Sequence, residues 1–135
     1  MSTYIDLAPG VGDVMEIALS VGDQQSASVA EVARAIAPCK GRVVGVAAWV
    51  ERVGGGTLPT DVDVMVEKGT TDLCSAVIDC WGSSTDNGPQ MGTLSTTASE
   101  VAVAAGDIFT LDTTVTGGGS VTIESVQARV WMVRE

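Results

Sequence analysis

Two pairs of aspartates are the first residues whose types and spacing could do chemistry. Asp61 and Asp63 alternate along one stretch, and Asp107 and Asp112 lie around another. A pair of carboxylates can act as the acid and base of glycoside hydrolysis, and clustered carboxylates can bind Ca²⁺. Neither pair has the spacing of a calcium-binding loop. We therefore interpret these residues as solvated charges that keep strand edges from aggregating, and we expect no metal site.

The absence of histidine is the main argument against catalysis. The sequence contains no histidine, which removes Ser–His and Cys–His nucleophiles and histidine-containing metal sites. Glycine triplets at 54–56 and 117–119 suggest phosphate loops, but neither is followed by the Gly-Lys-Ser/Thr of a P-loop. We predict hairpin tips at both triplets. The sequence therefore predicts a protein that is not an enzyme and has no catalytic residues and no cofactor.

The three cysteines, Cys39, Cys74 and Cys80, have no Cys-x-x-Cys spacing. If 74–80 forms one strand, the even spacing places the thiols of Cys74 and Cys80 on the same face but too far apart to pair. We expect all three to act as small hydrophobic residues of a reduced protein.

The three tryptophans could form a platform that stacks on a sugar, or anchors of a protein interface. Trp49 and Trp131 lie within apolar stretches and are expected in the core. Trp81 lies in a predicted loop, 80–84, and is the better interface candidate.

Strands must position these side chains, because the hydrophobic period along most of the chain is two. Val62, Val64 and Val66 alternate with a second set of residues through 61–67, which predicts a strand with one buried face; this second set is Asp61, Asp63, Met65 and Glu67. Residues 42–52 are apolar on both faces, which predicts a central strand covered on both sides. Further strands are expected at 13–20, 73–79, 100–104, 107–115 and 120–133, the last of them long and interior.

One segment fits two structures equally well. Ser28 followed by Glu31 has capping-box spacing, and apolar residues recur at helical intervals as far as Ile36. A short helix near 28–36 and an alanine-rich strand both fit this pattern.

Length and composition complete the predicted architecture. A chain of 135 residues is near the commonest size of a single domain. Aromatic residues make up only 4% of it, so Val, Ile, Leu and Ala must fill the core. Turn residues separate the short strands. We predict an all-β fold, a jelly-roll-like antiparallel β-sandwich over 13–135, preceded by an N-terminal arm at 1–12.

Charge excludes two classes of partner. Seventeen acidic and seven basic residues give a net charge of −10. Phosphate backbones and anionic membrane surfaces would repel such a protein, so we expect neither a nucleic acid nor a membrane as partner. The first six residues lack a basic segment, and no apolar run approaches the ~18 residues of a membrane span. We expect no signal peptide and synthesis in the cytoplasm.

Three stretches carry a family resemblance: residues 37–46, residues 57–70, and residues 101–111 with the glycine-rich hairpin that follows. Their rhythm resembles the jelly-roll modules of tailed-bacteriophage virion proteins, which include capsid decoration (cement or auxiliary) proteins and the heads of fibres. The resemblance covers 36–133. It implies a β-sandwich that often forms trimers, and it carries over no catalytic residue. A trimeric dUTPase would have a similar size and fold class, but its nucleotide-binding motifs have no match in this sequence.

The resemblance and the charge together imply a structural virion protein on the outer surface of a phage capsid, made in the host cytoplasm. A protein that faces packaged DNA would be neutral or basic. The expected partners are the major capsid protein, bound across its subunits to stabilise the shell, and further copies of the chain in a trimer. The alternatives are a receptor- or glycan-binding module of a fibre or tail and, ranked last, an enzyme that uses an acid pair.

The expected binding residues are Trp81 and three anchors of the N-terminal arm, Tyr4, Ile5 and Leu7. The arm could add a strand to a neighbouring protein. A frayed terminus is the alternative for this segment.

Overall fold

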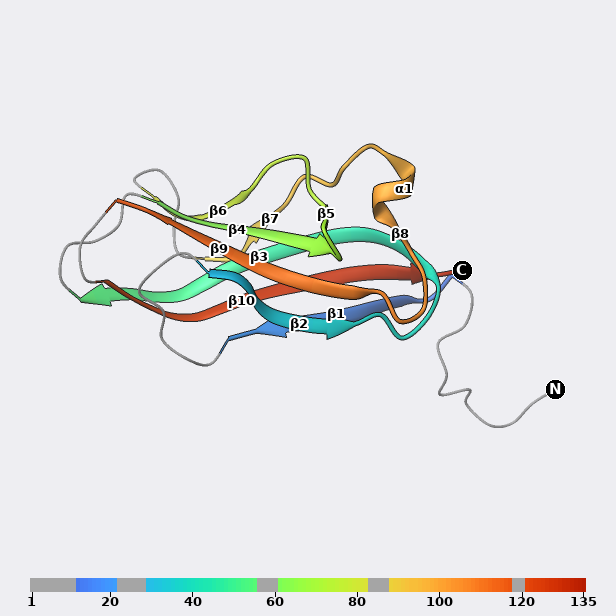
Figure 1. Ribbon diagram of the computed structural model, residues 1–135, viewed down its shortest axis with the longest axis horizontal. Coiled ribbons are helices and arrows are strands. Elements are labelled where there is room, and N and C mark those ends of the chain that lie inside the picture. The colour runs from blue at the N-terminus through green and yellow to red at the C-terminus, as the bar shows by residue number, and fades with distance from the viewer. Residues whose placement is uncertain (1–11, 22–28, 56–60, 83–87, 118–120) are drawn as a thin grey trace.

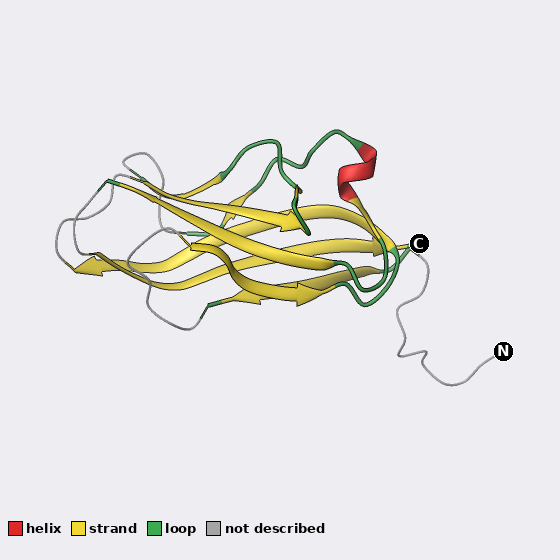
Figure 2. Ribbon diagram, in the orientation of Figure 1, coloured by secondary structure: helices red, strands yellow, loops and turns green. Residues whose placement is uncertain are grey.

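Two antiparallel sheets pack face to face in the computed structural model, which describes residues 12–21, 29–55, 61–82, 88–117 and 121–135 (Figure 1). Strands make up most of the described chain, as Figure 2 shows. Sheet A contains, in spatial order, β1 (Val14–Ser20), β10 (Val121–Arg134), β3 (Gly41–Gly55) and β7 (Gln90–Met91), with β8 (Ala102–Val103) also paired to β3. Sheet B contains β2 (Val29–Ile36), β9 (Ile108–Thr116), β4 (Asp61–Lys68) and β5 (Thr71–Asp72), with β6 (Ile78–Trp81) also paired to β4.

The order of the strands is that of a jelly roll. Strands β1 to β4 fall alternately in sheets A, B, A and B. The last two strands insert between earlier ones: β9 lies between β2 and β4, and β10 lies between β1 and β3. This interleaving of two antiparallel sheets is the arrangement of jelly-roll sandwiches. The predicted all-β, jelly-roll-like sandwich is confirmed, and so is the interior position of the final strand.

The core lies between the two sheets and is built from alternate residues. The side chains of Val62, Val64 and Val66 in β4 are fully buried, as the alternation predicts. Phe109 and Leu111 lie beside them in the neighbouring strand β9 of the same sheet and are also fully buried. Sheet A contributes a second set of buried side chains: Ile17, Leu19, Val43, Val46, Ala48, Val50, Val126, Ala128, Val130 and Met132.

A bulge in β3 changes which side chains point inward. Trp131 of β10 pairs with Gly45, but the next residue, Met132, pairs with Val43. Val44 is therefore an extra residue that points outward and is 41% exposed. The core is filled by Val43 before the bulge and by alternate residues after it: Val46, Ala48 and Val50. Coverage of β3 on both sides was the wrong prediction, since its outer face does not meet the other sheet. Its central position in the sheet is confirmed.

The segment that fits both a helix and a strand forms β2, so the described residues 29–36 are extended and not helical. The chain at Glu31 has a positive φ of 52°, and the pairing of β2 with β9 is irregular between Val29 and Ala33. The backbone N–H of Glu31 donates to Oδ1 of Asp112 at 2.6 Å. This contact with β9 supports a bulged edge strand in place of a helical turn.

Two other predicted strands are shorter or displaced. The short helix α1 (Ala98–Val101) takes up the start of the predicted strand at 100–104, and only β8 remains extended. Of the predicted strand at 73–79, residues 73–77 form a connection between β5 and β6, and only Ile78 and Asp79 are extended, at the start of β6. Leu73 and Cys74 are buried there, and Cys74 forms an isolated bridge with Leu94. Burial of apolar side chains in a connection produced the misleading pattern.

The predicted N-terminal arm, 1–12, lies outside the described residues except for Gly12. No helix among the described residues is long and apolar enough to cross a membrane.

Replacing Leu111 with alanine tests which face of β9 meets the core. Leu111 is fully buried, so we expect a loss of about 2–5 kcal/mol in the free energy of unfolding, measured by urea denaturation. Ile108→Ala is the control, because Ile108 is in the same strand but 41% exposed; we expect it to cost about 1 kcal/mol or less. Equal losses in the two variants would contradict the packing.

Candidate interaction surface

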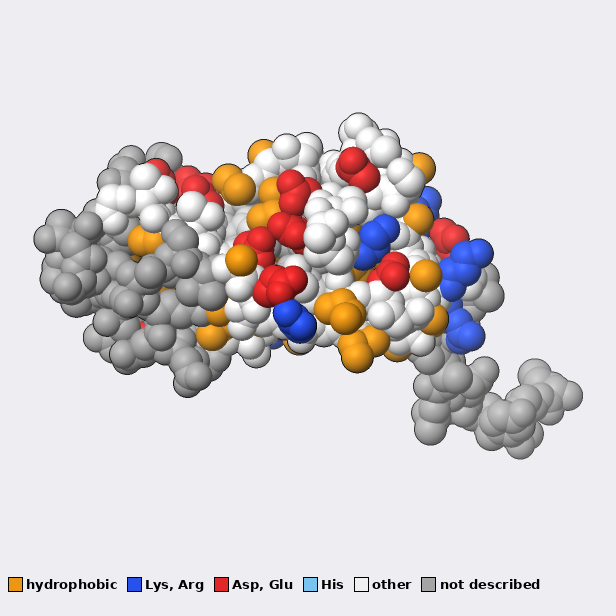
Figure 3. All heavy atoms as spheres, viewed as in Figure 1, with side chains coloured by type: hydrophobic (Ala, Val, Ile, Leu, Met, Phe, Trp, Pro, Cys, Tyr) orange, Lys and Arg blue, Asp and Glu red, His pale blue; other side chains and the backbone are white. Residues whose placement is uncertain are grey.

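The outer face of sheet B is acidic. Its strands contain seven acidic and two basic residues, a net of five negative charges. Figure 3 looks onto this side of the molecule, where carboxylates gather in the middle of the face. The acidic residues are Glu31, Asp61, Asp63, Glu67, Asp72, Asp79 and Asp112, and the basic ones are Arg34 and Lys68.

Glu67 is the most perturbed carboxylate on this face. Partial burial, a hydrogen bond with Asp112 and the charges of Asp112, Asp72 and Glu31 raise the pKa of Glu67 to about 7. In the sheet, Glu67 lies opposite Asp72, and it lies two residue pairs away from Asp112 along the β4–β9 ladder, on the same face. This carboxyl group is therefore partly protonated near neutral pH.

Asp61 and Asp63 lie on one face of β4, as the alternation predicts. Burial raises the pKa of Asp63 above its ordinary value, and the neighbouring charges of Asp79 and Asp61 add to the effect. Among the described residues, no group of acidic residues and cysteines is arranged to hold a metal ion. Asp107 and Asp112 are not brought together: Asp107 is in the turn before β9, and Asp112 is in the middle of that strand.

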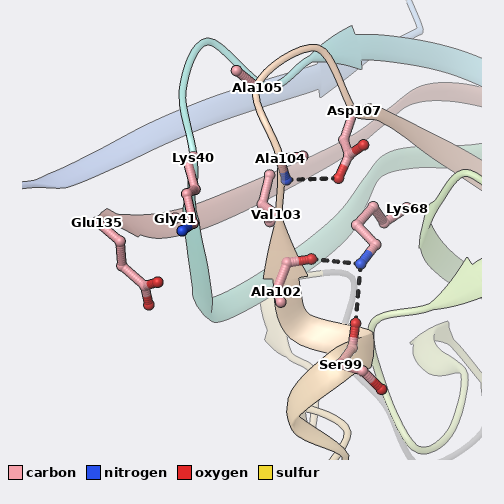
Figure 4. A pocket seen from close by; sticks show the side chains of 10 residues that line it. All are labelled: Lys40, Gly41, Lys68, Ser99, Ala102, Val103, Ala104, Ala105, Asp107 and Glu135. Carbon is pink, nitrogen blue, oxygen red and sulfur yellow. Dashed lines mark hydrogen bonds between the residues drawn. The ribbon is translucent and has the colours of Figure 1, made fainter.

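A cavity of about 520 Å³ opens at the end of the sandwich where α1 and β8 lie (Figure 4). Lys68 donates from Nζ to the backbone carbonyls of Ser99, at 3.2 Å, and Ala102, at 2.5 Å. The backbone N–H of Ala104 donates to Oδ2 of Asp107 at 2.8 Å. These charged side chains bind backbone groups around β8 and fasten the helix to sheet B. We therefore interpret the cavity as a structural feature of the place where α1 and β8 pack between the two sheets.

The cysteines lie where apolar residues would lie. Cys74 and Cys80 are buried free thiols, and burial raises their pKa values to about 11 and about 12. Cys39 is a partly buried free thiol with its sulfur 3.5 Å from the sulfur of Met15. Their predicted role as small hydrophobic residues is consistent with these positions. Cys74 and Cys80 do not share a strand, which corrects the assumed geometry.

Trp49 and Trp131 lie on the outer face of sheet A, half-buried, so the prediction that they are core residues is wrong. Small aliphatic side chains of β3 and β10 fill the inner face, and the alternation leaves both indoles on the other side. Three aliphatic side chains of sheet A are also exposed: Val14 (62%), Val44 (41%) and Met91 (67%). An exposed apolar face of this kind is typical of a surface that binds another molecule.

Of the residues predicted to bind a partner, only Trp81 lies in the described chain. Its predicted place in a loop is wrong, because Trp81 is the last residue of β6, where it pairs with Val62, is partly buried and packs against the core. Tyr4, Ile5 and Leu7 lie outside the described residues. The outer face of sheet A is the surface that sequence reasoning missed. Its signal was the second apolar face of 42–52, which was assigned to burial.

No family model and no curated protein matches the sequence. The fold is similar to the crystal structure of FLHE, with a TM-score of 0.51 and 19% identity over 90% of this chain and 98% of that one. It is also similar to a chain of the cyanophage Pam1 capsid asymmetric unit, with a TM-score of 0.51 and 17% identity over 98% of this chain and 95% of that one. At these identities the likeness concerns the fold alone.

Replacing Glu67 with glutamine tests whether the pKa of this carboxyl group is raised in the folded protein. The folded pKa of about 7 exceeds the ordinary value of 4.5, so the folded state holds the proton more tightly than the unfolded state. This contribution to stability is fully present below pH 4.5 and is lost as the pH rises through 7. Relative to wild type, Glu67→Gln should therefore become more stable between pH 5 and pH 8 in urea denaturation.

The control for this experiment is Glu51→Gln, which removes a carboxylate from β3 in sheet A and keeps Glu67. Its difference in stability from wild type should stay constant over the same pH range. A constant difference for Glu67→Gln as well would show that the carboxyl group of Glu67 does not titrate near neutral pH.

Proposed function

We propose that the chain is a structural virion protein that binds the outside of a phage capsid across major capsid protein subunits and stabilises the shell. The observation that carries this proposal is the unequal charge of the two sheets. The strands of sheet A contain four basic and three acidic residues, a net of one positive charge. The strands of sheet B carry a net of five negative charges.

This asymmetry favours one orientation on a partner. A protein of net charge −10 is repelled by other acidic surfaces and by packaged DNA. Docking through sheet A keeps the carboxylates of sheet B in solvent, where water and salt screen them. We therefore propose that sheet A faces the shell and that sheet B faces outward.

The fold supports a place in a virion without deciding it. The jelly roll is shared with a chain of the cyanophage Pam1 capsid asymmetric unit, and equally with FLHE, so the surface must supply the functional argument. We propose a binding module and not an enzyme, with neither nucleic acid nor membrane as partner. Because many copies act together on one shell, a few kcal/mol per site would be enough.

We further propose that the chain acts as a trimer, and that its N-terminal arm, through Tyr4, Ile5 and Leu7, contributes to binding. Trp81 remains a candidate contact at the end of β6.

A second candidate function is a receptor- or glycan-binding module of a fibre or tail. The observation that favours it is the pair of half-buried indoles, Trp49 and Trp131, on an outer face, since indoles can stack on sugar rings.

Shells assembled without this protein test the proposal. We expect them to form but to break at lower temperature or milder chelation than complete shells, and to recover their stability when the purified protein is added back. Release of packaged DNA on heating is the measurement. Shells whose stability does not depend on the protein would rule out a stabilising role, and binding to a glycan array would favour the second candidate.

A further inference from the structure

The outer face of sheet A has a regular layout in its middle. Three cross-strand rows run from β1 through β10 to β3. The first row is Glu16, Trp131 and Gly45, the second is Ala18, Arg129 and Ala47, and the third is Ser20, Gln127 and Trp49. Met91 of β7 extends the second row, because it pairs with Ala47. The two indoles thus flank a single guanidinium group, and we call Trp49, Met91, Arg129 and Trp131 the sheet A patch.

Gly45 allows the indole of Trp131 to lie low on the sheet. The Cε3 atom of Trp131 is 3.2 Å from the position that a Cβ on Gly45 would occupy, and the terminal carbon of Met91 is 3.9 Å from the same position. Any larger residue at 45 would therefore push the ring outward. The small side chains of Gly45 and Ala47 leave the patch flat, and Met91 is 67% exposed beside them.

Arg129 is held in place by its neighbours within the patch. Its Nε pairs with Oε1 of Glu16 at 3.0 Å, and its guanidinium carbon is 5.0 Å from the ring centroid of Trp49. Nη1 donates to the backbone carbonyl of Ala128 at 2.9 Å, and Nη2 donates to Oε1 of Gln127 at 3.3 Å. A guanidinium fixed in this way loses little conformational freedom when it binds a partner.

The donors of Arg129 indicate what the partner must offer. A guanidinium has five N–H donors, and within the described part of the chain three of them are used. Two remain for an acceptor, and a carboxylate is the acceptor whose geometry fits a guanidinium best. The net positive charge of the sheet A strands favours the same chemistry.

We propose that the sheet A patch is the epitope through which this protein binds its shell, and that the partner is a flat apolar protein surface bearing a carboxylate opposite Arg129. This inference rests on the proposed function and names the contact. Trp, Met and Arg are the residues enriched at the centres of protein interfaces. A glycan fits less well, because Met91 offers no hydrogen bond and Glu16 and Gln127 already bind Arg129.

The test is the binding of purified variants to shells that lack the protein, measured by cosedimentation over a range of concentrations. Met91→Glu places a negative charge at an exposed position of the patch, and Arg129→Gln removes the guanidinium. We expect each to weaken binding at least tenfold. Thermal melting followed by circular dichroism shows whether each variant remains folded, and Met91→Glu keeps the test valid if loss of Arg129 disturbs the sheet.

Two matched controls separate the patch from general effects of charge. Val77→Glu adds the same charge at another exposed aliphatic side chain, which is 52% exposed and lies outside both sheets. Arg34→Gln removes a guanidinium that is likewise paired with a glutamate, Glu31, but on sheet B. Both controls should bind within about twofold of wild type.

The possible outcomes are distinct. If wild type binds and the two patch variants bind as well as the controls do, the epitope lies elsewhere and the proposed function still stands. If wild-type protein does not bind the shells at all, the proposed function fails and the inference fails with it. Binding to a glycan array that both patch variants abolish would overturn the assignment of a protein partner.

Discussion

The pairing of β10 with both β1 and β3 is the constraint on which the rest of the structure depends. Because β10 is extended and interior, its alternate residues must point to opposite sides of sheet A. The residues from Val126 to Met132 that point inward complete the core, while Arg129 and Trp131 between them point outward. One strand therefore supplies both the burial that stabilises the sandwich and the side chains that could bind a partner.

The two outer faces of the sandwich differ in chemistry, although both inner faces are apolar. Mainly aliphatic side chains, together with Phe109, fill both inner faces, while the indoles of Trp49 and Trp131 lie on the outside. Sheet B carries carboxylates close enough for Glu67 to hold a proton near neutral pH. Sheet A carries indoles around a guanidinium that already has a carboxylate partner in Glu16. The chain thus has one face suited to solvent and one suited to contact.

The sequence was sufficient for elements with a long, strict alternation and insufficient where a local contact broke that alternation. The valines of β4 and the aliphatic residues of β10 predicted their strands and buried faces, because a period of two leaves one arrangement. The bulge at Val44, the bulged β2 and the buried connection at Cys74 all depend on partners distant in the sequence. The prediction placed Trp49 and Trp131 in the core because an aromatic residue within an apolar strand is compatible with a buried face and with an outer, binding face alike.

The most direct test of the central claim is an image reconstruction of the virion that contains this protein, at a resolution that separates the two sheets. The account predicts density on the outside of the shell, with sheet A and Trp131 against the capsid and sheet B with Glu67 toward solvent. Density inside the shell or on a tail would contradict the proposed location. A molecule bound outside with sheet B against the capsid would contradict the role of charge in its orientation.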